Sequence, residues 1–254
     1  MSTLTANEPG ASALGGQAHF LLRRLHSLTG LVFGGYLVVH LVVNATLSQG
    51  TNPDIYQMQV DKIHSLPLLL ILEWVLIFLP ILFHALYGIW ITVNGQPNVN
   101  QYPFGKNWFY LLQRISAIII AAFIPFHVLA MKGFFGPALR FDPHHATLTV
   151  IDHINASPLL AYFVYPLGIL ASCFHLANGF WTAAITWGLT VSAAAQRRWG
   201  LVCIGIFVAT LACGAAALGW AIAGHFPPAA SAQVLHPIMG WKPIMGMGSF
   251  PASA

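Results

Sequence analysis

Five apolar segments, each long enough to cross a bilayer, constrain this sequence more than any other feature. A membrane-spanning helix needs about 20 consecutive apolar residues, and inside lipid the backbone must form helices or a closed barrel. The segments are far longer than barrel strands, so we expect an all-α integral membrane bundle of five transmembrane helices. The composition agrees, with 57% hydrophobic and 6% charged residues. The predicted helices cover residues 24–48, 66–93, 108–133, 156–189 and 198–224, with ends approximate.

The basic residues indicate the orientation of this bundle, because cytoplasmic loops collect Lys and Arg. With the N-terminus in the cytoplasm, the inner side carries one acid, Glu8, and a larger set of basic residues. That set is Arg23, Arg24, Lys106, Arg114, Arg197 and Arg198. We therefore predict a flexible cytoplasmic leader at 1–18, a membrane domain at 19–224 and a tail outside at 225–254. The net charge of +4 then reflects topology, and no nucleic-acid partner is expected.

Four of the predicted helices each carry one deeply placed histidine. Counted at 1.5 Å per residue, His40 in the first helix and His127 in the third lie roughly 24–28 Å from the inner surface. His84 in the second helix and His175 in the fourth lie about 27 Å from the outer surface. The histidines therefore form two pairs, one near each face of the bilayer.

Two haems stacked across the membrane would require this arrangement, because a neutral imidazole can give a nitrogen to iron. Glycines near these histidines, such as Gly34, Gly35, Gly88 and Gly179, would leave room for a flat ligand. The same glycines could serve close helix packing, and a single intramembrane histidine could make a helix-to-helix hydrogen bond. A haem-free transporter that relays protons through intramembrane histidines also stays open.

Two motifs make the chain resemble a known family. They are "RRLHSLTG" at 23–30, followed by His40, and "LLQRIS" at 111–116, followed by His127. With His84 and His175, they resemble the dihaem cytochrome b membrane anchor of succinate dehydrogenases and fumarate reductases, in its five-helix, single-polypeptide form. The resemblance covers residues from about 20 to 224. It implies that His40 and His127 bind the iron of a distal haem, and that His84 and His175 bind the iron of a proximal haem.

The resemblance also implies contacts to the propionates of the proximal haem. In this family a His-Ser pair at the start of the first helix lies beside them, which here is His26 and Ser27. Arg114 enters the third helix at the same inner level, where a propionate would give a buried guanidinium its partner. The chain departs from one branch of the family, in which a glutamate that moves protons stands two residues before the histidine of the fourth helix. Here that position is Cys173, which puts this proton route in doubt.

The function implied by the resemblance is that of the quinone-reacting subunit of a succinate:quinone oxidoreductase in the cytoplasmic membrane. Its partners would be a flavoprotein subunit and an iron–sulfur subunit on the cytoplasmic side, and its electrons would pass through two b-type haems to menaquinone or ubiquinone. Candidates for the quinone site are Asp61, His64 and Glu73, ahead of the loop histidines His144, His145 and His153. The alternative is the dihaem cytochrome b of a hydrogenase, formate dehydrogenase or nitrate reductase.

Overall fold

The computed structural model describes residues 9–51, 54–96 and 99–224, and within them it has five helices long and apolar enough to span a membrane. The predicted all-α, five-span fold is therefore confirmed. The spans are built from α1 (Pro9–Ala45), α3 with α4 (Leu69–Glu73 and Leu79–Val93), α5 (Gly105–Met131), α7 (Tyr165–Thr186) and α8 (Ala193–Ala223). The predicted tail at 225–254 lies outside the described residues.

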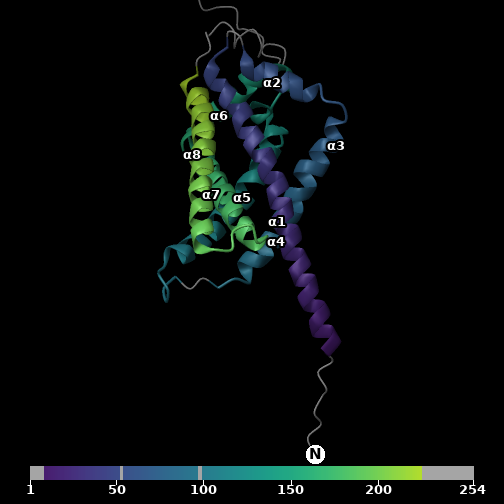
Figure 1. The fold of residues 1–254 in the computed structure, drawn as a ribbon. Coiled ribbons are helices and arrows are strands. Elements are labelled where there is room, and N and C mark those ends of the chain that lie inside the picture. Colours follow the sequence, from purple (N-terminus) through teal and green to yellow (C-terminus); the bar gives the residue numbers. More distant parts are fainter. Residues whose placement is uncertain (1–8, 52–53, 97–98, 225–254) are drawn as a thin grey trace, which may run out of the picture.

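Helix α7 is the centre of the bundle. In the span that contains α7, Leu160–Thr186, 44% of an apolar stretch of 18 residues is buried inside the protein. The corresponding share is 6% for the span that contains α3 and α4. Helix α7 packs against α5 and α8, while α1 packs against α4 and α8 (Figure 1). The outward faces are exposed and apolar, as at Leu82, Ile118 and Leu201, which suits contact with lipid.

Two of the spans contain a π-helical turn directly ahead of a proline-bearing helix start. Residues Trp74–Phe78 form one such turn before Pro80, and residues Leu160–Val164 form the other before Pro166. Proline has no N–H to donate and its ring collides with the carbonyl one turn earlier, so a widened turn relieves both problems. The second span, which we predict as one plain helix, therefore divides into α3 and α4, and the fourth span begins with a π turn.

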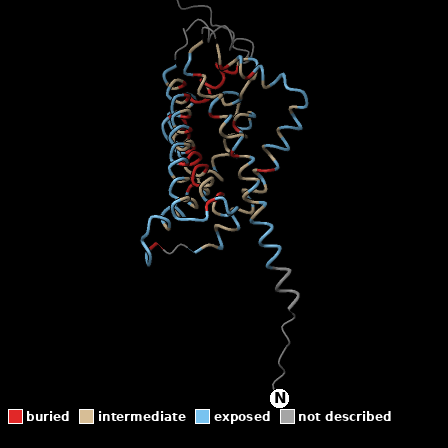
Figure 2. The backbone as a smooth tube through the Cα atoms, viewed as in Figure 1, coloured by how far each residue is buried: buried red, intermediate tan, exposed pale blue. Residues whose placement is uncertain are grey.

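Two short helices, α2 (Ile55–His64) and α6 (Ala146–Asn155), cover the end of the bundle opposite the N-terminus, which we call the cap end (Figure 1). A core cluster of buried residues joins them to α8 and to the residues after α1: Leu47, Tyr56, Val60, Ala146, Val150 and Ala217. Figure 2 shows buried residues gathered at this end and along the inner face of the bundle. The segment before α6 contains Gly136-Pro137 and Asp142-Pro143, which are typical of a loop and do not indicate a helix. The buried face of α6 stabilises it against the rest of the bundle.

Helix α1 begins earlier than expected from the sequence. It starts at Pro9, inside the stretch 1–18 that we predict to be a leader, and continues without a break to Ala45. A single helix therefore runs from within the predicted leader to the cap end, and it places His26 and His40 at two heights about 21 Å apart along its axis.

Candidate functional site

The four deeply placed histidines meet as two pairs across facing helices. The rings of His40 (α1) and His127 (α5) have centroids 6.1 Å apart and planes at 75°. The rings of His84 (α4) and His175 (α7) also have centroids 6.1 Å apart, with planes at 89°. The first pair lies toward the cap end, and the second toward the N-terminal end of the bundle, where His84 stacks on His26 with centroids 4.0 Å apart. The same two pairs are predicted from the sequence by counting residues along each helix at 1.5 Å per residue.

The spacing within each pair suits a metal held between two imidazoles. Metal–imidazole bonds of about 2.0–2.1 Å on opposite sides of one ion place the ring centroids about 6.4 Å apart. The observed 6.1 Å in both pairs lies close to this value. Within residues 9–51, 54–96 and 99–224, no group of three or more His, Cys, Asp or Glu side chains could hold a metal ion. An iron with four other ligands from a macrocycle needs only two protein ligands.

Hydrogen bonds determine which ring nitrogen of the His84–His175 pair is free. The Nδ1 of His84 lies 2.9 Å from the backbone carbonyl oxygen of His26, which can only accept, so Nδ1 carries the proton. The Nδ1 of His175 lies 3.2 Å from the Ser116 hydroxyl. That hydroxyl donates to the carbonyl of Gln113 at 3.0 Å, so it accepts from His175. Both histidines therefore keep Nε2, with its lone pair, for a ligand.

Glycines allow the close approach of helices at this pair. A Cβ on Gly30 of α1 would lie 2.5 Å from Cε1 of His84, and one on Gly88 of α4 would lie 3.1 Å from Cε1 of His26. Gly34 serves helix packing, because its Cβ would meet the side chain of Leu176 at 2.8 Å. A Cβ on Gly35 would meet nothing within 4 Å. Among the described glycines, Gly30, the last residue of the "RRLHSLTG" motif, lies closest to a histidine of the two pairs.

Three polar atoms on the helices that carry or contact the His84–His175 pair are buried without a hydrogen-bond partner among the described residues: Nδ1 of His26 on α1, the hydroxyl of Tyr87 on α4 and Nε of Arg114 on α5. Buried polar groups are paired in most proteins, so such atoms call for a bound partner. All three can donate a hydrogen bond, which suits the carboxylates of a haem. Tyr87 follows His84 by three residues on α4, a helical spacing that could have identified it in the sequence.

Two of the predicted propionate residues, His26 and Arg114, carry two of these unpartnered atoms. The guanidinium of Arg114 lies over the ring of Tyr110, 3.6 Å from its centroid, and close to Gly95. Ser27 accepts a hydrogen bond from Nε1 of Trp187 at 2.9 Å, and its own hydroxyl hydrogen stays available to a second partner. The structure thus brings His26 and His84 into direct contact, while Ser27 is tied to the loop after α7.

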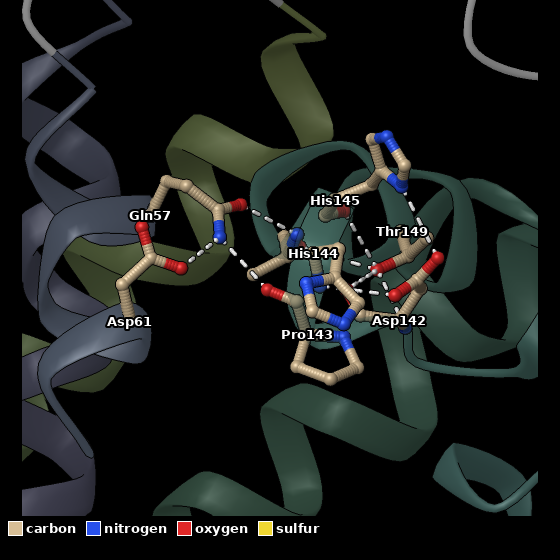
Figure 3. Close-up of polar contacts among 8 residues, drawn as sticks. Gln57, Asp61, Asp142, Pro143, His144, His145 and Thr149 are labelled. Atoms are coloured by element: carbon tan, nitrogen blue, oxygen red, sulfur yellow. Dashed lines mark hydrogen bonds and ion pairs between the residues drawn. The ribbon is translucent and has the colours of Figure 1, made fainter. Parts of the chain in front are cut away.

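The predicted quinone-site residues lie at or near the cap end, in separate surroundings. Asp61 is exposed and accepts from the Gln57 amide at 2.8 Å, and the same amide nitrogen donates to the carbonyl of Pro143 (Figure 3). His64 is exposed, and its Nδ1 lies 3.0 Å from the carbonyl of its own helix at Val60. Glu73 is half-buried at the end of α3, directly before the π-helical turn.

The loop histidines differ from one another in burial. His145 donates from Nδ1 to the Asp142 carboxylate at 3.1 Å (Figure 3), and this hydrogen bond holds the pKa of Asp142 below its usual value. His144 is exposed. His153 is no loop residue: it lies on α6, fully buried, and burial lowers its pKa. Gln57 joins α2 to the segment before α6, so Asp61 and His145 belong to one connected region of the cap end.

No family model matches this sequence. The chain is 36% identical over 199 residues to the succinate dehydrogenase cytochrome b558 subunit of Bacillus subtilis (strain 168). The match covers 77% of this chain and 94% of that relative. The family resemblance carried by the two motifs is thereby confirmed. The chain belongs to the family of cytochrome b membrane-anchor subunits of succinate dehydrogenase.

Proposed function

We propose that this subunit carries electrons between an iron–sulfur subunit and a membrane quinone through two b-type haems. The observation that supports this most is the pairing of four intramembrane histidines, with both ring pairs at a centroid distance of 6.1 Å. His84 and His175 would hold the iron of one haem, and His40 and His127 the iron of the other. Haem held by these residues would supply one-electron transfer.

The chain's own residues have three tasks in this function. Backbone and hydroxyl acceptors at Nδ1 keep the imidazoles in the tautomer that presents Nε2. His26, Tyr87 and Arg114 supply buried donors that would neutralise propionate charge at the N-terminal end of the bundle. The apolar helix faces exclude water from both levels, which helps set the reduction potentials.

The orientation we propose follows from the basic residues. The N-terminal end of the bundle carries Arg23 and Arg24 at one helix and Arg197 and Arg198 at another, as expected for a cytoplasmic side. The flavoprotein and iron–sulfur subunits would dock there, next to the haem of His84 and His175, and the described C-terminal end of α8 would face outward. Electrons from succinate would then cross the membrane toward the cap end.

The quinone would react at the cap end, beside the haem of His40 and His127. Reduction of a quinone consumes protons, so its site needs proton-bearing groups in an apolar setting. Asp61, His64 and Glu73 are our candidates, because all three belong to α2 and α3, at the entry to the second span. The hydrogen bonds from Gln57 to Asp61 and to the carbonyl of Pro143 support Asp61 as part of an ordered surface.

The test is the haem content and redox behaviour of the purified complex. We expect about two b-type haems per chain, with at least one reduced by succinate. His84→Ala should remove one haem and stop reduction of the remaining haem by succinate, while dithionite still reduces it. A colourless complex, or a His84→Ala variant with its full haem content, would refute the proposal.

A further inference from the structure

In the histidine pair at the cap end, His127 is the first member of a chain of hydrogen bonds. The Nδ1 of His127 lies 3.0 Å from the hydroxyl oxygen of Tyr165, at the start of α7. The same hydroxyl is hydrogen-bonded to Nε2 of His153 on α6. His153 in turn has its Nδ1 2.8 Å from the carbonyl oxygen of Leu139. Four groups thus form one continuous chain from the membrane interior to the cap end.

The direction of each hydrogen bond in this chain is fixed. The carbonyl of Leu139 can only accept, so Nδ1 of His153 carries a proton. Burial lowers the pKa of His153, which keeps the ring neutral and leaves its Nε2 as an acceptor. Tyr165 must therefore donate its single hydroxyl hydrogen to His153. Its oxygen then accepts from Nδ1–H of His127, and Nε2 of His127 keeps its lone pair.

Packing holds the chain rigid. Tyr165 is 7% exposed and His153 is 0% exposed, and Tyr165 belongs to a core cluster with Ile151, Ile154 and Ala221. The side-chain amide of Asn155 donates to the carbonyl of Ala221 at 2.7 Å, which ties α6 to α8. The facing histidine is held less closely, because the hydroxyl of Tyr36 is 3.5 Å from Nδ1 of His40.

We propose that Tyr165 and His153 are positioning residues that lower the reduction potential of the haem at the cap end. The inference rests on the proposed function, in which His127 is a ligand of that haem. A hydroxyl that donates one hydrogen bond becomes a better acceptor of another. A good acceptor at Nδ1 makes an imidazole a stronger ligand, which favours ferric over ferrous iron. Helix α6 would thereby change the reduction potential of the haem through hydrogen bonds and not through direct contact.

The test uses the assembled complex, with visible absorbance followed during an anaerobic redox titration. Tyr165→Phe keeps the ring and removes the acceptor, so we expect two bound haems and an upward shift of one midpoint potential. Ser116→Ala removes the acceptor from His175 and should raise the other potential instead. Tyr162→Phe is the matched control, because Tyr162 is a tyrosine of the neighbouring turn that is 69% exposed. It should change neither potential.

A second pair of variants acts on the far end of the chain. His153→Leu leaves the Tyr165 hydroxyl without its acceptor and should raise the same potential as Tyr165→Phe, by a smaller amount. His153→Gln offers an amide oxygen in place of Nε2 and should return that potential toward the wild-type value.

Two outcomes would overturn the inference while leaving the proposed function intact. In the first, Tyr165→Phe binds two haems with both potentials unchanged, or shifts the same haem as Ser116→Ala. In the second, Tyr165→Phe fails to assemble and His153→Leu and His153→Gln have identical potentials. Failure of the proposed function is distinct, because it would show as a wild-type complex without haem or as a His84→Ala variant with its full haem content.

Discussion

Gly30→Ala is the sharpest perturbation that the structure offers at the His84–His175 pair. The added methyl group would lie 2.5 Å from Cε1 and 2.7 Å from Nδ1 of His84, closer than real contacts allow. His84 cannot turn aside freely, because its ring stacks on His26 and its Nδ1 donates to the carbonyl of that residue at 2.9 Å. We therefore expect the imidazole to be pushed off its position and that hydrogen bond to be lost.

The size of the effect follows from two contributions. Overpacking a filled site costs about 1–3 kcal/mol, and a lost hydrogen bond costs about 0.5–1.5 kcal/mol. Together they amount to about 1.5–4.5 kcal/mol, which corresponds to roughly 10- to 2000-fold weaker retention of the haem. The matched control is Gly16→Ala on the same helix, where the residue is exposed and the new methyl group would meet nothing within 4 Å.

The assay is haem transfer from the purified complex to an excess of apomyoglobin, followed by absorbance. Gly30→Ala should lose one haem much faster than the wild type, while the other haem leaves at the wild-type rate. Gly16→Ala should match the wild type for both haems. Equal retention of both haems in Gly30→Ala and Gly16→Ala would refute the reasoning, because it would mean that His84 does not need the space beside Gly30.

Three further predictions concern other parts of the molecule. Tyr87→Phe removes one buried donor beside the same pair, so less propionate charge is neutralised and that haem's midpoint potential should fall in a redox titration. Asp54→Ala removes the side chain that accepts from the backbone N–H at the start of α2 and from Thr147, so it should cost about 1–2 kcal/mol of stability, seen as a lower melting temperature. His145 lowers the pKa of Asp142, so the folded chain binds fewer protons at this carboxyl than the unfolded chain does. The hydrogen bond therefore stabilises the fold above the ordinary carboxyl pKa, and this stabilisation is lost as the pH falls through the lowered pKa. His145→Ala should weaken this dependence in melting curves recorded between pH 2 and 6, whereas an unchanged curve would contradict it.

The sequence was sufficient for the spans and for the pairing of histidines because both follow from one-dimensional rules. Apolar length predicts a helix in lipid, and a constant rise per residue converts position into depth. A count of residues therefore places His40 level with His127, and His84 level with His175, and the ring centroids of each pair lie 6.1 Å apart.

The cap end was not predictable in the same way. The segment that forms α6, "ATLTVIDHIN", is rich in β-branched residues and follows two prolines, so its local preferences do not favour a helix. Packing of its buried face against α8 and Tyr165 decides its structure. The assignment of His153 to a loop was wrong for the same reason, since its burial depends on residues from α7 and from the segment before α6.

The π-helical turns before Pro80 and Pro166 have a consequence for how these two spans can vary. A π turn is equivalent to one extra residue inserted into an α-helix, and one residue corresponds to about 100° of rotation. The wider turn absorbs that extra residue, so the helix on either side of it keeps the direction of its faces. Deleting one residue within Trp74–Phe78 would therefore restore an ordinary α-helical turn and leave the faces of α3 and α4 where they are, whereas deleting one residue within α4 would rotate everything beyond it by about 100°.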